Sequence, residues 1–64
     1  MADRIWAKRK LKTSANNIDS CIKHYQTLGV AYKDDYTYIS HYLYNLVGIA
    51  ETLKELTELL DKEL

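Results

Sequence analysis

The sequence predicts an all-α fold: an antiparallel two-helix hairpin that associates into a four-helix bundle as a homodimer. Apolar residues recur at steps of three and four in both halves of the chain, proline is absent, and glycine occurs only at positions 29 and 48. β-Sandwiches and loop-rich scaffolds need turn residues at regular intervals. The composition therefore favours long helices within one domain, residues 1–64.

The first predicted helix covers about residues 4–28. Its apolar stripe consists of Ala7, Leu11, Ala15, Ile18, Ile22 and Tyr25. Steps of three and four place such residues on one face of a helix. Gly29 follows Leu28 where a left-handed residue ends many helices, and Val30 can complete that C-terminal motif.

The second predicted helix covers about residues 35–63. A short connection, residues 29–34, makes the two helices antiparallel neighbours, and Asp34 or Asp35 is the expected N-cap. An unbroken heptad stripe is expected to form the contact between the helices: Ile39, Tyr42, Leu46, Ile49, Leu53, Leu56 and Leu60. Leu43, Val47 and Ala50 widen this stripe on one flank.

The two halves of the chain carry opposite charge. Residues 1–32 contain six cations and two acids, a net charge of +4, and residues 33–64 contain three cations and seven acids, a net charge of −4. Antiparallel packing brings the basic residues 4–12 beside the acidic residues 51–63. Each exposed ion pair contributes only about 0–1 kcal/mol, but together they favour antiparallel over parallel pairing.

One hairpin provides little core for a chain of 64 residues. Small domains normally need disulfides, a metal or a second subunit, and Cys21 is the only cysteine. Residues 36–50 carry no charge and are apolar on most sides, which predicts that they are covered. Gly48 lets another backbone approach there. The expected self-association residues are Ile39, Tyr42, Leu43, Leu46, Val47, Ile49 and Leu53.

Six tyrosines and one tryptophan are the only aromatic residues. These side chains bring a large contact area with few rotors to order, and they are enriched at protein interfaces. We expect the surface that binds a larger protein to contain Trp6, Tyr32, Tyr36, Tyr38 and Tyr44.

A nucleic-acid-binding surface is the alternative. Five cations lie close together near Trp6, whose ring can stack on a base: Arg4, Lys8, Arg9, Lys10 and Lys12. The opposing interpretation is a solvated helix face that the acidic second helix neutralises, which the net charge of zero favours.

The sequence predicts no metal, no cofactor and no enzyme activity. Cys21 and His24 have i, i+3 spacing, but a structural zinc site needs four ligands and, even with His41, the chain offers no second close pair. Asp34 and Asp35 are expected to cap a helix rather than to act as paired catalytic carboxylates.

The predicted location is the cytoplasm. The charge-free residues 36–50 are fewer than the ~20 that span a bilayer, and no apolar secretory segment follows the basic residues near the start.

In size and layout the chain resembles the small helical dimers that regulate plasmid copy number, a resemblance of architecture that carries no functional residue. Small tyrosine-rich chains without catalytic motifs are also typical of accessory proteins of bacteriophages and mobile elements. The predicted function is a non-enzymatic adaptor or inhibitor that binds a larger protein. The alternatives are a small nucleic-acid-binding regulatory dimer and a purely structural oligomer.

Overall fold

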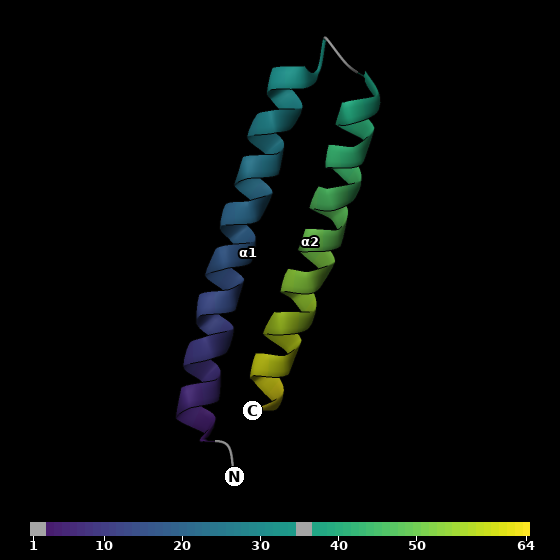
Figure 1. The fold of residues 1–64 in the computed structure, drawn as a ribbon. Helices are drawn as coiled ribbons and strands as arrows, with labels where there is room; N and C mark the ends of the chain where they lie inside the picture. Colours follow the sequence, from purple (N-terminus) through teal and green to yellow (C-terminus); the bar gives the residue numbers. More distant parts are fainter. Residues whose placement is uncertain (1–2, 35–36) are drawn as a thin grey trace.

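The computed structural model describes residues 3–34 and 37–64. Two helices account for nearly all of them, α1 (Arg4–Tyr32) and α2 (Thr37–Glu63). The helices lie side by side and antiparallel, so the start of α1 and the end of α2 are at the same end of the rod (Figure 1). The rod measures 51 × 14 × 14 Å. The predicted all-helical hairpin is confirmed.

Helix α1 begins after Asp3 and does not end at Gly29. The Ile5 backbone N–H donates a hydrogen bond to the Asp3 carboxylate at 2.9 Å, which caps the helix and favours its positive dipole end. The helix then continues through Gly29 to Tyr32, and no residue in the described ranges has a positive φ. The prediction that Gly29 ends the helix is wrong. Glycine inside a helix costs only about 1 kcal/mol relative to alanine, which is too little to stop this helix.

The connection is shorter than predicted because α1 extends further. Asp34 lies in the turn, three positions before α2 begins, and is too early to be its N-cap. Asp35, the other predicted cap, lies outside the described residues.

The face of α1 that packs on α2 is the predicted one. All six residues of its apolar stripe are partly buried: Ala7, Leu11, Ala15, Ile18, Ile22 and Tyr25. On α2, Ile39 and Ser40 near the turn are partly buried, and the buried and partly buried residues after them form what we call the inward α2 stripe: Leu43, Val47, Ala50, Lys54, Thr57 and Asp61. Leu43 and Ala50 are 8% and 9% exposed and form the most buried contact. The prediction that the heptad stripe containing Tyr42 and Leu46 packs on α1 is wrong, because the contact uses residues one position further along the chain.

Ion pairs between the helices agree with this shift of the contact by one residue. Lys54 Nζ lies 2.7 Å from Asp19 Oδ1, and Lys8 Nζ donates to the Asp61 carbonyl oxygen at 3.2 Å, with Asp61 Oδ1 at 3.8 Å. The hydrogen bond with Asp19 raises the pKa of Lys54 above its ordinary value of 10.5, against a smaller lowering by burial. Lys54 and Asp61 therefore face α1 at positions that lie outside the predicted heptad stripe.

The predicted charge pairing is only partly realised. Among the described residues, the basic start of α1 and the acidic end of α2 are joined by one ion pair, Lys8 with Asp61. The pair between Lys54 and Asp19 has the opposite polarity, with the cation on α2.

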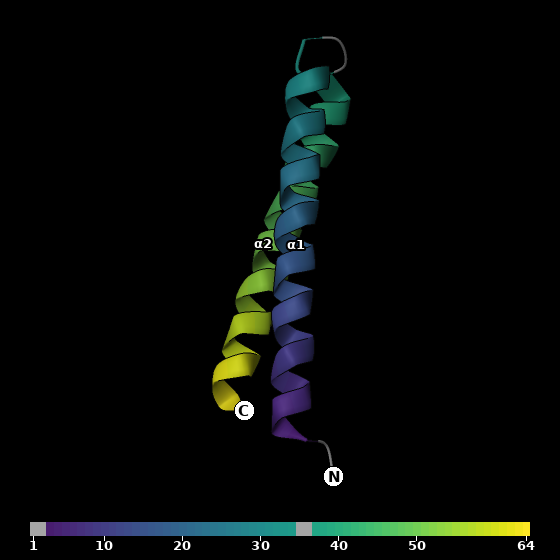
Figure 2. The ribbon, with the colours of Figure 1, turned by 90° about the vertical axis from the view of Figure 1, so that its left-hand side faces the viewer.

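One hairpin leaves much of its surface in water. Seen from the side, α1 and α2 cross (Figure 2). The accessible surface is 5462 Å², whereas a compact monomer of 7.5 kDa has about 4,250 Å². No described side chain is fully buried. Neither helix, over its described residues, has the length and hydrophobicity that crossing a membrane requires.

Candidate interaction surface

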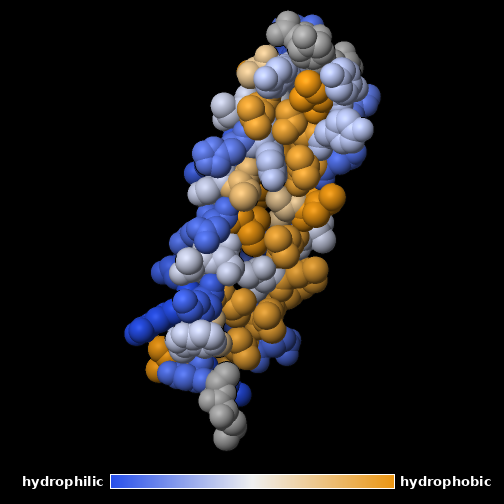
Figure 3. Space-filling model, viewed as in Figure 1, coloured by the Kyte–Doolittle hydropathy of each residue, from blue (hydrophilic) through white to orange (hydrophobic). Residues whose placement is uncertain are grey.

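Six of the exposed large apolar side chains on α2 lie along one side of the helix, beside the contact with α1. We call them the exposed α2 stripe: Tyr42, Leu46, Ile49, Leu53, Leu56 and Leu60. Each is between 40% and 69% exposed. Successive residues of a helix are separated by about 100° of rotation, so this stripe lies next to the inward α2 stripe rather than under α1. In the space-filling view, hydrophobic side chains gather in a band along α2 (Figure 3).

The exposed α2 stripe is longer than predicted. The leucines after Glu51 were expected to pack on α1, with self-association confined to residues 36–50 and Leu53. Leu56 and Leu60 are instead 59% and 51% exposed, because Lys54, Thr57 and Asp61 occupy the inward positions. The sequence did indicate the full length of this stripe, since the heptad spacing continues without a break to residue 60.

The predicted self-association residues separate into two groups. Leu43 is buried, and Ile39 and Val47 are partly buried within the hairpin. The other four remain exposed, as members of the exposed α2 stripe: Tyr42, Leu46, Ile49 and Leu53.

A shallow groove of about 510 Å³ lies on the outer side of α2. It is lined by Tyr44, Asn45, Gly48, Ile49, Thr52, Leu53 and Leu56. A methyl group added at Gly48 would meet nothing within 4 Å. No contact within the hairpin therefore requires glycine at this position.

The aromatic residues predicted to bind a larger protein do not form one surface. Trp6, 56% exposed, stands near the start of α1. Tyr32, Tyr38 and Tyr44 are also exposed, but they lie toward the turn, at the other end of the 51 Å rod. Tyr36 lies outside the described residues. The structure thus provides an aromatic site at each end.

At the open end, Trp6 is paired with a cation. Lys10 Nζ lies 5.8 Å from the centroid of the Trp6 ring, within the range of a cation–π interaction. Because the two residues are one helical turn apart, they form a small amphipathic site with an exposed indole and an ammonium group.

Three of the five basic residues, Arg4, Lys8 and Lys12, lie along one face of α1 at four-residue spacing, whereas Arg9 and Lys10 project to other sides. Residues 8, 9 and 10 are consecutive, so they project about 100° apart. Lys8 is paired with Asp61 and Lys10 lies over Trp6. The other three form no ion pair with any described residue: Arg4, Arg9 and Lys12.

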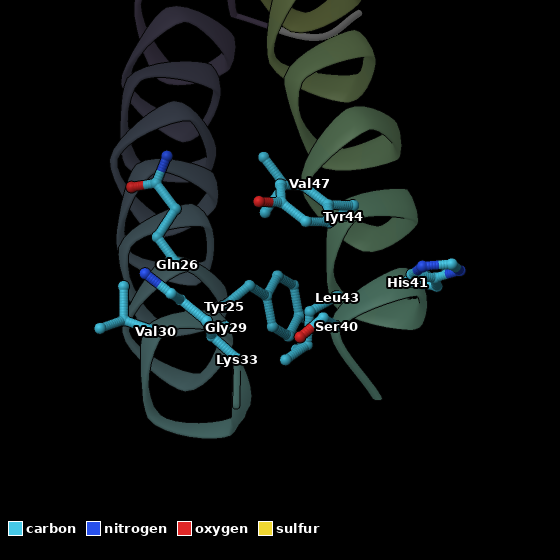
Figure 4. Close-up of a pocket in the computed structure, with 10 residues that line it drawn as sticks. All are labelled: Tyr25, Gln26, Gly29, Val30, Lys33, Ser40, His41, Leu43, Tyr44 and Val47. Carbon is cyan, nitrogen blue, oxygen red and sulfur yellow. The ribbon is translucent and has the colours of Figure 1, made fainter. Parts of the chain in front are cut away.

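A cavity of about 430 Å³ opens between the helices near the turn. The Tyr25 side chain points from α1 toward α2, whereas His41 points away from α1 (Figure 4). Gly29 lines the cavity. Ser40 Oγ is buried there without a hydrogen-bond partner among the described atoms. The polar groups around this cavity do not converge on one point.

The predicted absence of a metal concerned Cys21, His24 and His41. All three are exposed, and the described residues contain no group of three or more histidine, cysteine, aspartate or glutamate side chains placed to hold a metal ion.

Comparisons with known proteins gave no match to a family model, to a curated protein or to a solved structure. The function is inferred from the surface of the hairpin itself. On that surface, the exposed α2 stripe is the feature that packing within one hairpin leaves unexplained.

Proposed function

We propose that this chain is a non-enzymatic protein-interaction module. It self-associates through the exposed α2 stripe into a four-helix bundle, and the assembly binds a larger protein as an adaptor or inhibitor through its exposed aromatic ends. The observation that carries the proposal is the exposure of six large apolar side chains along one side of α2. Apolar stripes of this length at heptad spacing are typical of helices that pack against another helix.

The surface area supports the first part of the proposal. The hairpin exposes about 1,200 Å² more than a compact monomer of its mass. A protein interface of standard size buries about 800 Å² on each partner. The excess is therefore large enough for one full interface.

The aromatic ends support the second part. Exposed tryptophan and tyrosine are enriched at the centres of protein interfaces, and Trp6 contributes little to the packing of the hairpin. Its pairing with Lys10 leaves much of the indole in water. A partner with an apolar pocket and an acidic rim would match this site.

Solution mass tests self-association. We expect the wild type to have twice the 7.5 kDa chain mass in light scattering over a dilution series, and Leu53→Asp to lose this mass because a charge is placed on the stripe. Lys23→Asp, an exposed change on the other helix, is the matched control and should keep the mass. A wild type that stays at 7.5 kDa and melts cooperatively at every concentration would contradict the proposal.

Capture from cells of the source organism tests the larger partner. We expect wild-type bait to retain a protein that Trp6→Ala bait loses, with helicity unchanged in circular dichroism. Ile5→Ala removes the neighbouring side chain, 64% exposed, and is the control that should retain the partner. Equal retention by both variants would exclude Trp6 as the contact.

The alternative function is a nucleic-acid-binding regulatory dimer, favoured by the unpaired state of Arg4, Arg9 and Lys12 among the described residues. Salt separates the two. Binding through phosphate contacts weakens steeply as salt increases, whereas an aromatic protein interface responds little.

A further inference from the structure

We infer that the exposed α2 stripe packs antiparallel against the same stripe of a second copy, with a two-fold axis that crosses α2 near Glu51. The inference rests on the proposed function, because it assumes that the stripe is covered. It adds the identity of the covering element, its direction and its register.

We choose α2 of the second copy as the covering helix because the alternative, α1 of the second copy, is polar on the side that would cover the stripe. The side of α1 next to the stripe is mainly polar: it presents Lys10, Ser14, Asn17 and His24, together with Cys21 and Leu28, all exposed. Burying these polar groups against leucine leaves their hydrogen-bonding groups without partners, which is unfavourable. The same stripe on a second copy offers only apolar side chains and one tyrosine. A second α2 therefore covers the stripe better than a second α1.

Ion pairing favours the alternative, α1 of one copy on α2 of the other, but only weakly. Placing α1 of one copy on α2 of the other brings basic residues 4–12 near acidic residues 51–63. Exposed ion pairs contribute little each and are screened by salt. Six large apolar side chains, each at least 40% exposed, outweigh them.

Charge along α2 sets the direction of packing. Residues 37–50 carry no charge, whereas residues 51–63 carry five acids and two lysines. Parallel packing would lay one acidic half along the other. Antiparallel packing lays each acidic half along an uncharged half, which avoids repulsion between like charges.

The register follows from the spacing of the stripe. Its residues are symmetric about position 51, so an antiparallel copy centred there aligns every apolar side chain with an apolar partner. Leu46 meets Leu56 of the second copy, Ile49 meets Leu53, and Tyr42 meets Leu60. A shift by one heptad would leave a pair at each end uncovered.

Two spin-label distances test the arrangement. Thr52 and Glu63 are both exposed and lie about three turns apart, so they project from the same side of α2. Nitroxides are attached to the Thr52→Cys and Glu63→Cys variants, each in a Cys21→Ser background, and distances between the two copies are measured by pulsed dipolar spectroscopy. Circular dichroism and solution mass confirm that each labelled variant matches the wild type.

The antiparallel arrangement predicts unequal distances. The labels at position 52 lie beside the two-fold axis, and those at position 63 lie about 36 Å apart along the helices at 1.5 Å per residue. A parallel α2 pair, or α1 on α2 with both turns at one end, gives equal short distances at the two positions. Packed helix axes are only about 8–10 Å apart.

The outcomes are distinguishable. A short distance at 52 with a long distance at 63 supports the inference. Equal distances in a particle of twice the chain mass overturn it and leave self-association intact. A monomeric mass without dipolar coupling overturns both, and Trp6-dependent capture then tests the interaction role separately.

Discussion

Truncating Leu56 distinguishes a lone hairpin from a covered one. Full burial of a leucine stabilises a fold by about 1.5–3 kcal/mol. Leu56 is 59% exposed in the hairpin, so Leu56→Ala in a lone hairpin should cost only about 1 kcal/mol. If a second copy covers Leu56, the cost should rise to the roughly 2–5 kcal/mol per chain that is typical of buried leucines.

The assay is urea unfolding, followed by circular dichroism at two chain concentrations. Leucine and alanine have similar helix propensities, so the change reports burial and not helix formation. Leu43→Ala is the matched control, because Leu43 is 8% exposed and its loss should cost about 2–5 kcal/mol in either case. A dimer should also gain about 1.4 kcal/mol for each tenfold increase in concentration. A loss near 1 kcal/mol for Leu56→Ala, with no dependence on concentration, would refute the reasoning.

Four further substitutions test individual features of the hairpin. Gly29→Ala should stabilise the hairpin by about 0.5–1 kcal/mol in urea unfolding, because Gly29 is helical and an added Cβ meets nothing within 4 Å. Gly48→Ala should stabilise it by the same amount unless the backbone of a partner helix lies against Gly48. A smaller stabilisation at Gly48 than at Gly29 therefore indicates that a partner backbone approaches Gly48 closely. Asp3→Ala should cost about 0.5–2 kcal/mol by removing the N-cap of α1, and an unchanged thermal midpoint would exclude that cap. Lys54→Met should lose stability relative to the wild type below pH 10.5, because the folded-state pKa of Lys54 is raised, and this difference should disappear as the pH rises through that raised pKa. Both proteins carry the same six tyrosines, so tyrosine ionisation cancels in the comparison, and a difference that persists above the raised pKa would rule out the Asp19 hydrogen bond as its cause.

The parts of the fold that periodicity determines were predictable. The stripe on α1 is the only apolar series on that helix, so Leu11, Ile18 and Ile22 had one possible role. The end of α2 was also predicted, at residue 63. Gly29 misled the prediction because its local preference for a turn is weak, about 1 kcal/mol, and α1 continues through it to Tyr32.

The inward face of α2 was not predictable from hydrophobicity alone. Two stripes with the same heptad spacing lie side by side on this helix, one residue and about 100° apart. The more hydrophobic stripe was assigned to the contact with α1. The structure places the mixed one there: Leu43, Val47 and Ala50 fill the first part of the contact, and Lys54 and Asp61 find partners in Asp19 and Lys8 further along it. Such pairings depend on three-dimensional register, which the order of residues along one helix does not reveal.

The two stripes of α2 also explain why the helices differ in composition. A helix that packs on one neighbour needs one apolar stripe, whereas a helix inside a bundle packs on two neighbours and needs a wider apolar face. α1 has one stripe and carries most of the cations of the chain, and α2 has two stripes. This asymmetry fits an assembly in which α2 lies inside and α1 outside. In such an assembly, Trp6 and the cations of α1 that form no ion pair with a described residue remain on the surface, where a second, larger partner can reach them.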